Sequence, residues 1–331
     1  MAEGKGPLAL VTGAAGFIGS HLVEDLVEAG WRVRAFVRYN SRSDIGNLRL
    51  LPKETLEKVH VFAGDLKDPT AVDRAVEGAD TVFHLGALIA IPYSYINPVD
   101  FVQTNVTGTI HMLEAARRHR VRRVVHTSTS ETYGTALYAP IDEAHPMQGQ
   151  SPYSASKIGA DKMAESFWHA FGLPVTTIRP FNTYGPRQSA RAVIPTIAVQ
   201  ALTGDVIRLG SLAPTRDLNF VKDITRGFRL AAEKEAAVGE TINLGTGKEI
   251  SIGELAEIVM EITGGGKRVV VEEKRVRPEK SEVMRLVADA SRAEKLLGWK
   301  PEVPIREGLG RTVAWVRENL GRFHDVGNYV V

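Results

Sequence analysis

The sequence predicts an α/β fold built around a doubly wound parallel sheet, with a smaller α/β lobe toward the C-terminus. Short apolar runs alternate with amphipathic segments of helix length through the first half, and a glycine-rich turn follows the first run. This alternation is typical of βαβ units, whose parallel strands are buried on both faces. The expected strands cover residues 8–11, 33–37, 59–63, 81–85, 124–127 and 175–179.

The pattern changes after Pro180. Prolines and glycines interrupt the alternation until a strand-like run returns at 241–244. Further on, Ser251 and Glu254 have the spacing of a capping box, which predicts the start of a helix over 252–262. The expected division is a first domain over residues 1–180, with a return at about 218–246, and a smaller lobe over 181–217 and 247–331.

The composition excludes several classes of function. Of 331 residues, 41 are lysine or arginine and 39 are aspartate or glutamate, and a formal charge of +2 gives no general electrostatic reason to bind nucleic acid or a membrane surface. The absence of cysteine removes disulfides, thiol nucleophiles and thiolate metal sites, and we expect no metal. No apolar stretch reaches the length of a membrane span. We therefore expect a soluble cytoplasmic protein.

The glycine-rich turn after the first strand indicates a dinucleotide site. Gly13 permits a tight turn, Gly16 lets backbone N–H groups approach a pyrophosphate, and Gly19 allows the helix to pack closely on the strand. We expect Phe17 and Ile18, in the first turn of that helix, to join the cofactor site. Three spaced glycines alone also suit an ordinary turn, but the preceding strand and the βαβ context favour dinucleotide binding. We interpret the first domain as a Rossmann-type NAD(P)-binding domain.

Candidate cofactor contacts continue at the ends of later strands. Dehydrogenases that prefer NAD usually carry an acidic residue after the second strand, whereas this chain has Arg38, followed by polar and basic residues at 40–42. An arginine there can hold a 2′-phosphate and favours NADP; a solvated arginine with bound NAD is the alternative. Asp65, after the third strand, either contacts the adenine ring or caps a helix. Further cofactor contacts are expected from Leu66, Leu85 and Ala87.

Tyr153 and Lys157 begin an amphipathic segment that we expect to be helical to about Phe171. Four residues apart, the two side chains share one helix face. A nearby ammonium favours phenolate, so we expect Lys157 to let Tyr153 take a hydroxyl proton near neutral pH while hydride leaves the carbon. Lys157 can also bind the nicotinamide ribose. A tyrosine and a lysine at this spacing are more often surface residues, but their position after a dinucleotide turn favours catalysis.

Together these motifs resemble the extended short-chain dehydrogenase/reductase superfamily over essentially the whole chain. The resemblance rests on Thr12–Gly19, Asp65, His84–Ala87, Asn105, Ser128–Tyr133 and the pair Tyr153 and Lys157. It implies that Asn105 also serves the cofactor site. It further implies that NAD or NADP stays tightly bound and is regenerated in each turnover.

The segment Thr129-Ser130-Glu131 resembles one group within that superfamily. In its sugar epimerases the position of Glu131 is typically small or hydroxylated, whereas its nucleotide-sugar 4,6-dehydratases have glutamate there. The segment is similar to the GDP-mannose dehydratase pattern, and the dTDP-glucose enzymes have aspartate at the middle position. Because Ser130 cannot act as a carboxylic acid, we expect Glu131 to serve as both base and acid. An isolated glutamate on a strand-end loop would by default face solvent.

The resemblance implies a reaction in three parts. Tyr153 removes the proton from the C4 hydroxyl of a hexose as hydride passes to the cofactor, and Thr129 hydrogen-bonds the C4 oxygen. Glu131 then takes the C5 proton while water leaves C6. Hydride returns to C6 and a proton to C5, which gives a 4-keto-6-deoxy sugar.

Four longer segments resemble the 4,6-dehydratases of legionaminic acid synthesis, which act on GDP-N-acetylglucosamine: residues 90–95, 148–153, 187–196 and 277–282. Only this resemblance favours GDP, because no residue pattern separates guanine from uracil. A guanidinium suits a diphosphate through its fixed donor fork and permanent charge, although any single arginine could instead be a surface ion-pair partner. The substrate contacts expected are Ser94 for the hexose and, toward the phosphates, Asn182, Arg187, Arg191, Arg216 and Arg277.

The resemblance also implies a homodimer. In this superfamily the helices at 99–119 and 153–171 commonly make a four-helix contact. The apolar residues that would serve it, or else the core, are Ile110, Met112, Leu113, Met163 and Phe167.

Two alternatives to a nucleotide-sugar dehydratase remain. In an NAD-dependent UDP-sugar 4-epimerase or a reductase, Glu131 would be incidental. A non-catalytic redox-sensing regulator that binds NADP would be expected to lack Tyr153 or Lys157, and this chain has both.

Overall fold

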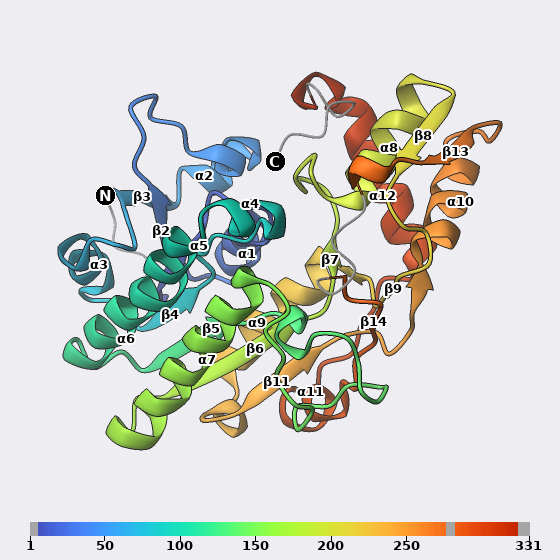
Figure 1. Ribbon diagram of the computed structural model, residues 1–331. Coiled ribbons are helices and arrows are strands. Elements are labelled where there is room, and N and C mark those ends of the chain that lie inside the picture. The colour runs from blue at the N-terminus through green and yellow to red at the C-terminus, as the bar shows by residue number, and fades with distance from the viewer. Residues whose placement is uncertain (1–5, 276–281, 324–331) are drawn as a thin grey trace.

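A seven-stranded parallel sheet organises the first part of the chain (Figure 1). The computed structural model describes residues 6–275 and 282–323. The strand order is β11-β6-β5-β4-β1-β2-β3, and neighbouring strands all run parallel. This confirms the predicted Rossmann-type α/β fold. The strands are β1 (Leu8–Thr12), β2 (Arg32–Arg38), β3 (Val59–Gly64), β4 (Thr81–His84), β5 (Arg123–Thr127), β6 (Val175–Pro180) and β11 (Thr241–Leu244).

Helices cover both faces of the sheet, so its strands are buried from two sides. Neighbouring residues of one strand therefore enter different cores; in β1, for example, Leu10 packs in one core and Val11 in the other. One face is covered by α1 (Phe17–Glu28), α9 (Val221–Glu233) and α11 (Ser291–Leu297). The other is covered by α3 (Pro69–Val76), α6 (Gly108–Arg118) and α7 (Pro152–Phe171).

Helix α7 has strong signals at both ends. Ser151 caps it through a reciprocal pair of hydrogen bonds with Ser154, and Pro152 occupies the first turn, where its missing N–H costs no helical bond. Gly172 ends it in the left-handed conformation, with φ of 65°. These caps fix where the predicted oxidation pair lies on the helix.

The helix expected over 99–119 is interrupted. Helices α4 (Ile91–Ile96) and α5 (Pro98–Phe101) lead into a π-helical turn at Val102–Thr107, and α6 follows it. Short π-helical segments are frequent at functional sites. This one contains Asn105, and its wider turn directs that side chain toward the loop after β4.

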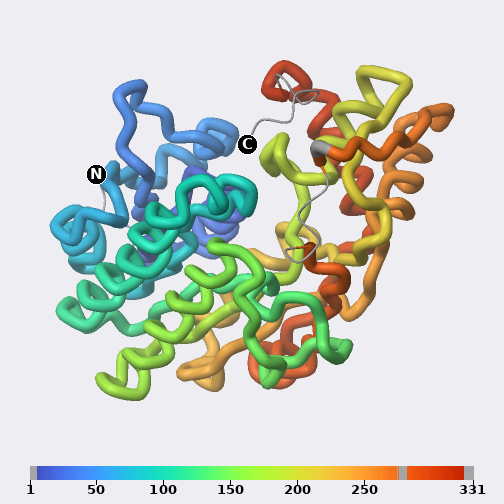
Figure 2. Tube along the Cα trace, in the orientation of Figure 1, coloured from blue at the N-terminus to red at the C-terminus, as the bar shows by residue number. Residues whose placement is uncertain are grey.

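The remaining elements lie in a second group beside the sheet (Figure 2), and most of them pack around a separate core. Its helices are α8 (Val193–Thr203), α10 (Ile252–Ile262) and α12 (Ile305–Glu318). The predicted capping box at Ser251 and Glu254 is confirmed, and α10 has the predicted bounds. Its short strands are β7 (Thr183–Tyr184), β8 (Val206–Leu209), β9 (Thr215–Arg216), β10 (Asn219–Phe220), β12 (Ile250–Ser251), β13 (Arg268–Val271) and β14 (Arg285–Leu286).

The chain returns to the large sheet late. After the first part of the second group, α9 packs on α1 and β11 pairs with β6. Of the apolar residues considered for a dimer contact, Met112, Leu113 and Phe167 are buried in the core of the single chain. Among the described residues, no helix is both long and apolar enough to cross a membrane.

Candidate active site

The carboxyl ends of β1, β4, β5 and β6 meet at one edge of the sheet, where ligands of doubly wound folds bind. The predicted cofactor turn follows β1, and the predicted catalytic segment follows β5. The parallel topology therefore brings together residues that lie more than a hundred positions apart in the sequence.

The turn after β1 has the shape that a pyrophosphate needs. Gly13 has φ of 67°, and a Cβ there would lie 2.9 Å from the amide nitrogen of Gly86. A Cβ on Gly19 would collide with the carbonyl oxygen of Gly13. Gly16, at the N-cap of α1, is exposed, and no side chain caps the helix there. The first-turn amides, which include Phe17 and Ile18, have no partner within their helix and are placed to meet an anion.

A buried hydrogen-bond chain fixes the loop after β4. Thr12 Oγ1 accepts from the Gly86 N–H and bonds His84 Nδ1, both at 2.9 Å. His84 Nε2 lies 3.0 Å from Thr109 Oγ1, whose hydroxyl donates to the Asn105 carbonyl. Burial lowers the pKa of His84 far below its ordinary value, so the ring is neutral. The half-buried Leu85 and Ala87 are thereby held at the sheet edge.

Asn105 is a structural link in this site. Its amide donates to the Leu88 carbonyl and to Ser156 Oγ, both at 2.9 Å, and it accepts from the Leu88 N–H at 2.8 Å. Ser156 in turn donates to the carbonyl of Tyr153. The side chain expected at the cofactor therefore joins the β4 loop to the start of α7.

The residues predicted to contact the adenosine half of the cofactor differ in how accessible they are to a ligand. Arg38 is exposed at the end of β2, and its side chain has no hydrogen bond or ion pair within the described ranges. Asp65 accepts from the Lys67 N–H at 2.9 Å; it does not cap α3, which Asp68 caps. Leu66 is buried in the core, so only its backbone could face a ligand.

Thr129, Glu131 and Tyr153 lie together at the end of β5. Thr129 precedes a short helical turn at Ser130–Tyr133, and its Oγ1 accepts from the Glu131 N–H at 3.3 Å. Burial raises the pKa of Tyr153 well above its ordinary value; a hydrogen bond with Thr129 opposes this rise and the charge of Glu131 adds to it. Glu131 is half-buried, whereas Ser130 is buried. Glu131 is therefore the acid that remains accessible beside the phenol.

Lys157, which we expect to favour the Tyr153 phenolate, is held by a strand-end carbonyl. Its Nζ donates to the Thr127 carbonyl at 2.6 Å, and burial is the largest influence on the pKa of Tyr153. The effect of Lys157 on the phenol stays a prediction. Burial lowers the pKa of Lys157 to about 8, and the charge of Asp161 opposes that change. Residue spacing placed both side chains on one helix face, but it could not show that a strand-end carbonyl would hold the ammonium.

Two of the four predicted phosphate-binding arginines have protein partners. Arg187 lies 3.4 Å from Glu24 of α1. Arg216 lies 3.2 Å from Glu282 and is buried. Arg191 is exposed, and Arg277 lies outside the described residues. As ligand contacts these arginines remain predictions.

Ser94 and Asn182, the two uncharged polar residues predicted to contact the substrate, differ in whether a polar group remains unpaired. Ser94 is fully buried and its hydroxyl donates to the Ile91 carbonyl at 2.6 Å, which does not support a direct contact with the hexose. Asn182 Oδ1 is buried without a hydrogen-bond partner in the described part of the chain. Buried polar atoms are rarely left unpaired, so Asn182 keeps a free group for a ligand.

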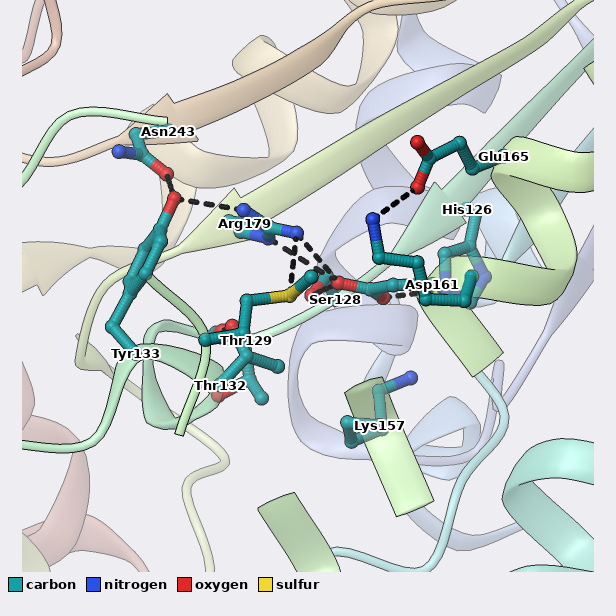
Figure 3. Close-up of polar contacts among 12 residues, drawn as sticks. His126, Ser128, Thr129, Thr132, Tyr133, Lys157, Asp161, Glu165, Arg179 and Asn243 are labelled. Carbon is teal, nitrogen blue, oxygen red and sulfur yellow. Dashed lines mark hydrogen bonds and ion pairs between the residues drawn. The ribbon is translucent and has the colours of Figure 1, made fainter. Parts of the chain in front are cut away.

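A buried charged network beneath this edge was missed by sequence reasoning (Figure 3). Asp161 of α7 pairs with Arg179 of β6, and Arg179 Nη1 donates to the Tyr133 hydroxyl at 2.9 Å. Tyr133 then donates to Asn243 of β11 at 2.8 Å. Two signals could have revealed it: Asp161 is one helical turn beyond Lys157, and Arg179 is a charge inside a strand predicted to be buried.

The described residues contain no cluster of histidine and acidic side chains that could hold a metal ion. The end of β5 instead offers a phenol, a carboxylate and a hydroxyl close together, with the Lys157 ammonium on the Thr127 carbonyl.

Comparisons with known proteins agree with this arrangement. The family of GDP-mannose 4,6 dehydratases matches residues 10–312. A dTDP-glucose 4,6-dehydratase of Actinoplanes sp. is 35% identical over 317 residues, which cover 94% of this chain and 98% of the relative.

Solved structures include dehydratases and epimerases. The dTDP-glucose 4,6-dehydratase of Streptomyces venezuelae, solved with NAD bound, is 31% identical and superposes with a TM-score of 0.84 over 96% of this chain and 99% of that one. The UDP-glucose 4-epimerase of Thermotoga maritima, solved with UDP-glucose, is 30% identical with a TM-score of 0.86 over 95% and 99%. The chain belongs to the GDP-mannose 4,6 dehydratase family, among the extended short-chain dehydrogenases/reductases.

Proposed function

We propose that this protein is a nucleotide-sugar 4,6-dehydratase, a lyase that converts a nucleoside-diphosphate hexose into its 4-keto-6-deoxy form. The observation that carries the proposal is the position of Glu131 beside Thr129 and Tyr153 at the end of β5. An oxidation site needs only a phenol, a hydroxyl and an ammonium. A carboxylate at the same place adds the base that removal of a carbon-bound proton requires.

The residues divide the reaction between them. Tyr153 accepts the proton of the C4 hydroxyl, and Thr129 holds the C4 oxygen by a hydrogen bond. Glu131 removes the proton from C5, which the C4 ketone has made acidic. The C6 hydroxyl is protonated and leaves as water. With Ser130 buried and uncharged, Glu131 is also the group that protonates the leaving hydroxyl. The product keeps its C4 ketone and gains hydrogen at C6.

The glycine turn and the strand-end residues fit a nicotinamide dinucleotide. When bound, the oxidised nicotinamide would accept the hydride from C4, its reduced form would return that hydride to C6, and the positive charge of the oxidised ring would favour the Tyr153 phenolate. The bound NAD of the Streptomyces venezuelae enzyme supports NAD for this chain. The exposed Arg38 supports NADP, and mass spectrometry of the cofactor released from the purified protein distinguishes the two.

GDP-N-acetylglucosamine is the substrate that we propose to test first. Its support is the resemblance of residues 90–95, 148–153 and 187–196 to dehydratases of legionaminic acid synthesis. The test is incubation with GDP-, UDP- and dTDP-hexoses, followed by mass spectrometry. We expect loss of one water from one of them, and no loss from any would contradict the proposal.

The role of Glu131 is tested by Glu131→Gln. We expect water loss to fall by about a hundredfold or more, while oxidation at C4 continues and reduced cofactor accumulates. The control is Glu165→Gln, which alters an exposed acid on α7 that pairs with Lys162. Water loss at the normal rate in Glu131→Gln would exclude the elimination role.

A UDP-sugar 4-epimerase is the second candidate, supported by the match to the Thermotoga maritima enzyme. Epimerisation leaves the mass of the sugar unchanged, so the same assay separates the two activities.

For assembly, we propose a homodimer through α5 and α7, since Val99 and Val102 are 62% and 50% exposed on this side of the chain. Analytical ultracentrifugation tests this.

A further inference from the structure

One buried hydrogen bond joins the two halves of the catalytic machinery. Ser128 directly follows β5 and precedes Thr129, and its Oγ donates to Asp161 Oδ2 at 2.5 Å. Both residues are 3% exposed. Asp161 lies on α7, one turn beyond Lys157 and two turns beyond Tyr153. The bond therefore connects the segment that carries the elimination base to the helix that carries the oxidation pair.

Asp161 is fixed from two further sides (Figure 3). His126 Nε2 of β5 lies 3.0 Å from its Oδ1, and Arg179 of β6 donates to its Oδ2 from Nε at 3.3 Å and Nη2 at 3.0 Å. Burial acts to raise the pKa of Asp161, but the bonds and charges of these neighbours lower it to about 2. The carboxylate is thus charged at neutral pH and held by several hydrogen bonds, so it can anchor the Ser128 hydroxyl.

Apart from the contact between Asp161 and His126, which lies before Thr127 and so does not hold the segment that carries Glu131, the other contacts named between the strand end and α7 depend on groups that the reaction uses. Lys157 holds the Thr127 carbonyl, and Tyr153 is hydrogen-bonded to Thr129. Both contacts must change when a sugar hydroxyl binds and its proton moves. The bond from Ser128 to Asp161 involves no reacting group, so it can persist through the whole cycle.

We propose that Ser128 is a positioning residue, which through Asp161 sets the distance between the elimination base Glu131 and the oxidation pair Tyr153 and Lys157. This inference rests on the proposed dehydratase function. Its consequence concerns the order of events. After oxidation at C4, the proton at C5 must be removed before hydride returns to C4 and the ketone is reduced again. When the strand end is no longer held, Glu131 is misplaced, while Tyr153 and Lys157 remain on their helix.

The test is Ser128→Ala, measured by single-turnover kinetics on the sugar that loses water in the mass-spectrometry assay. The absorbance of reduced nicotinamide reports oxidation, and mass spectrometry reports water loss. We expect water loss to slow by about tenfold to a hundredfold, with oxidation changed much less, so that reduced cofactor accumulates several-fold above its level in the wild type. This is the behaviour of Glu131→Gln in a milder form.

Two variants separate positioning from stability. Thr176→Val removes a buried hydroxyl on β6 that donates to the Ala237 carbonyl at 2.7 Å, far from the catalytic edge, and should leave the ratio of water loss to oxidation unchanged. Ser128→Thr keeps the hydroxyl and should restore that ratio. If Ser128→Ala does not fold, Ser128→Thr can still be compared with the wild type. A ratio of water loss to oxidation in Ser128→Thr as low as that in Glu131→Gln would contradict the proposal.

The outcomes are distinct from those for the proposed function. If the wild type dehydrates a sugar and folded Ser128→Ala shows the wild-type ratio, the positioning role is wrong and the dehydratase function stands. If the wild type removes water from no sugar, the proposed function fails and this inference fails with it.

Discussion

The catalytic edge and the arginines expected to bind the diphosphate are held in opposite ways. At the edge, Asp161 and Arg179 are buried, bonded to each other, and anchored to β5, β6 and α7 without any ligand. Arg187 and Arg216 also have carboxylate partners, Glu24 and Glu282, but a phosphate would have to replace these.

This difference indicates how the site is built. Groups that must hold a precise geometry for proton transfer are fixed before binding, which reduces the reorganisation needed during the reaction. Groups that recognise a phosphate can rest on a protein carboxylate, because a guanidinium forms similar forked bonds with either anion. The predictions below test each half of this comparison.

The largest effect is expected from Arg179→Met. It leaves the Asp161 carboxylate buried without its guanidinium, and removal of one partner from a buried pair costs about 3–5 kcal/mol. Urea denaturation measures this loss. Arg306→Met is the control, because it removes an exposed guanidinium paired with Glu261 at 2.7 Å, and should cost less than about 1 kcal/mol.

The effect of Arg179→Met should depend on pH in one direction. The pKa of Asp161 is lowered to about 2 in the folded protein and is about 4 in an unfolded chain. The stability that its ionised form contributes is thus complete above about pH 4 and is lost as the pH falls toward 2. The difference between wild type and variant should shrink in acid. A difference that grows in acid would contradict this account.

A smaller effect, of opposite sign, is expected from Lys157→Met. Burial lowers the pKa of Lys157 from 10.5 to about 8, which corresponds to a cost of roughly 3 kcal/mol for the charged form. The variant loses the bond to the Thr127 carbonyl, so we expect a net gain in stability of about 1–2 kcal/mol together with loss of turnover. Thermal or urea unfolding measures the gain.

The pH dependence of this gain is also fixed in sign. Below about pH 8, Lys157 is charged in both states and the full cost is present. Between about pH 8 and 10, the folded protein releases the proton while the unfolded chain keeps it, so the wild type becomes more stable relative to the variant. The gain should therefore shrink with rising pH. Lys162→Met, at an exposed position on the same helix, is the control.

The smallest effect is expected from Glu24→Gln. Glu24 holds Arg187 at 3.4 Å and Lys222 at 3.0 Å. If Arg187 binds a phosphate of the substrate, replacing the competing carboxylate by a neutral amide should lower KM for the nucleotide sugar by about fivefold, or roughly 1 kcal/mol. Asp25→Asn, which alters the next residue of α1 and its pair with Arg229, should leave KM unchanged. An unchanged KM in Glu24→Gln would remove Arg187 from the proposed binding site.

The regular part of the fold could be predicted from the sequence because its signals are local. The seven strands lie within one residue of the expected bounds, since each is a short apolar run between turns. The capping box at Ser251 also depends only on neighbouring residues. The π-helical turn at Val102–Thr107 was not predicted; its Asn105 bonds Leu88, which lies on another segment, and such a long-range contact has no local signal.

The candidate site shows the same limit. The spacing of Tyr153 and Lys157 placed them correctly on α7, and the strand end brought Thr129 and Glu131 beside them. The partners of Lys157 and Arg187 could not be predicted, since they lie 30 or more residues away in the chain. Residue type and spacing indicate which groups are present, whereas long-range packing decides which of them are already bonded.

The position of β11 in the sheet has a consequence for synthesis on the ribosome. Strand β6 remains an open sheet edge until β11 has been made and has paired with it. The bond from Tyr133 to Asn243 forms only then. The nascent chain must therefore keep an incomplete catalytic edge while much of the second group of elements emerges, and a chain that stops before residue 241 would expose this edge to aggregation.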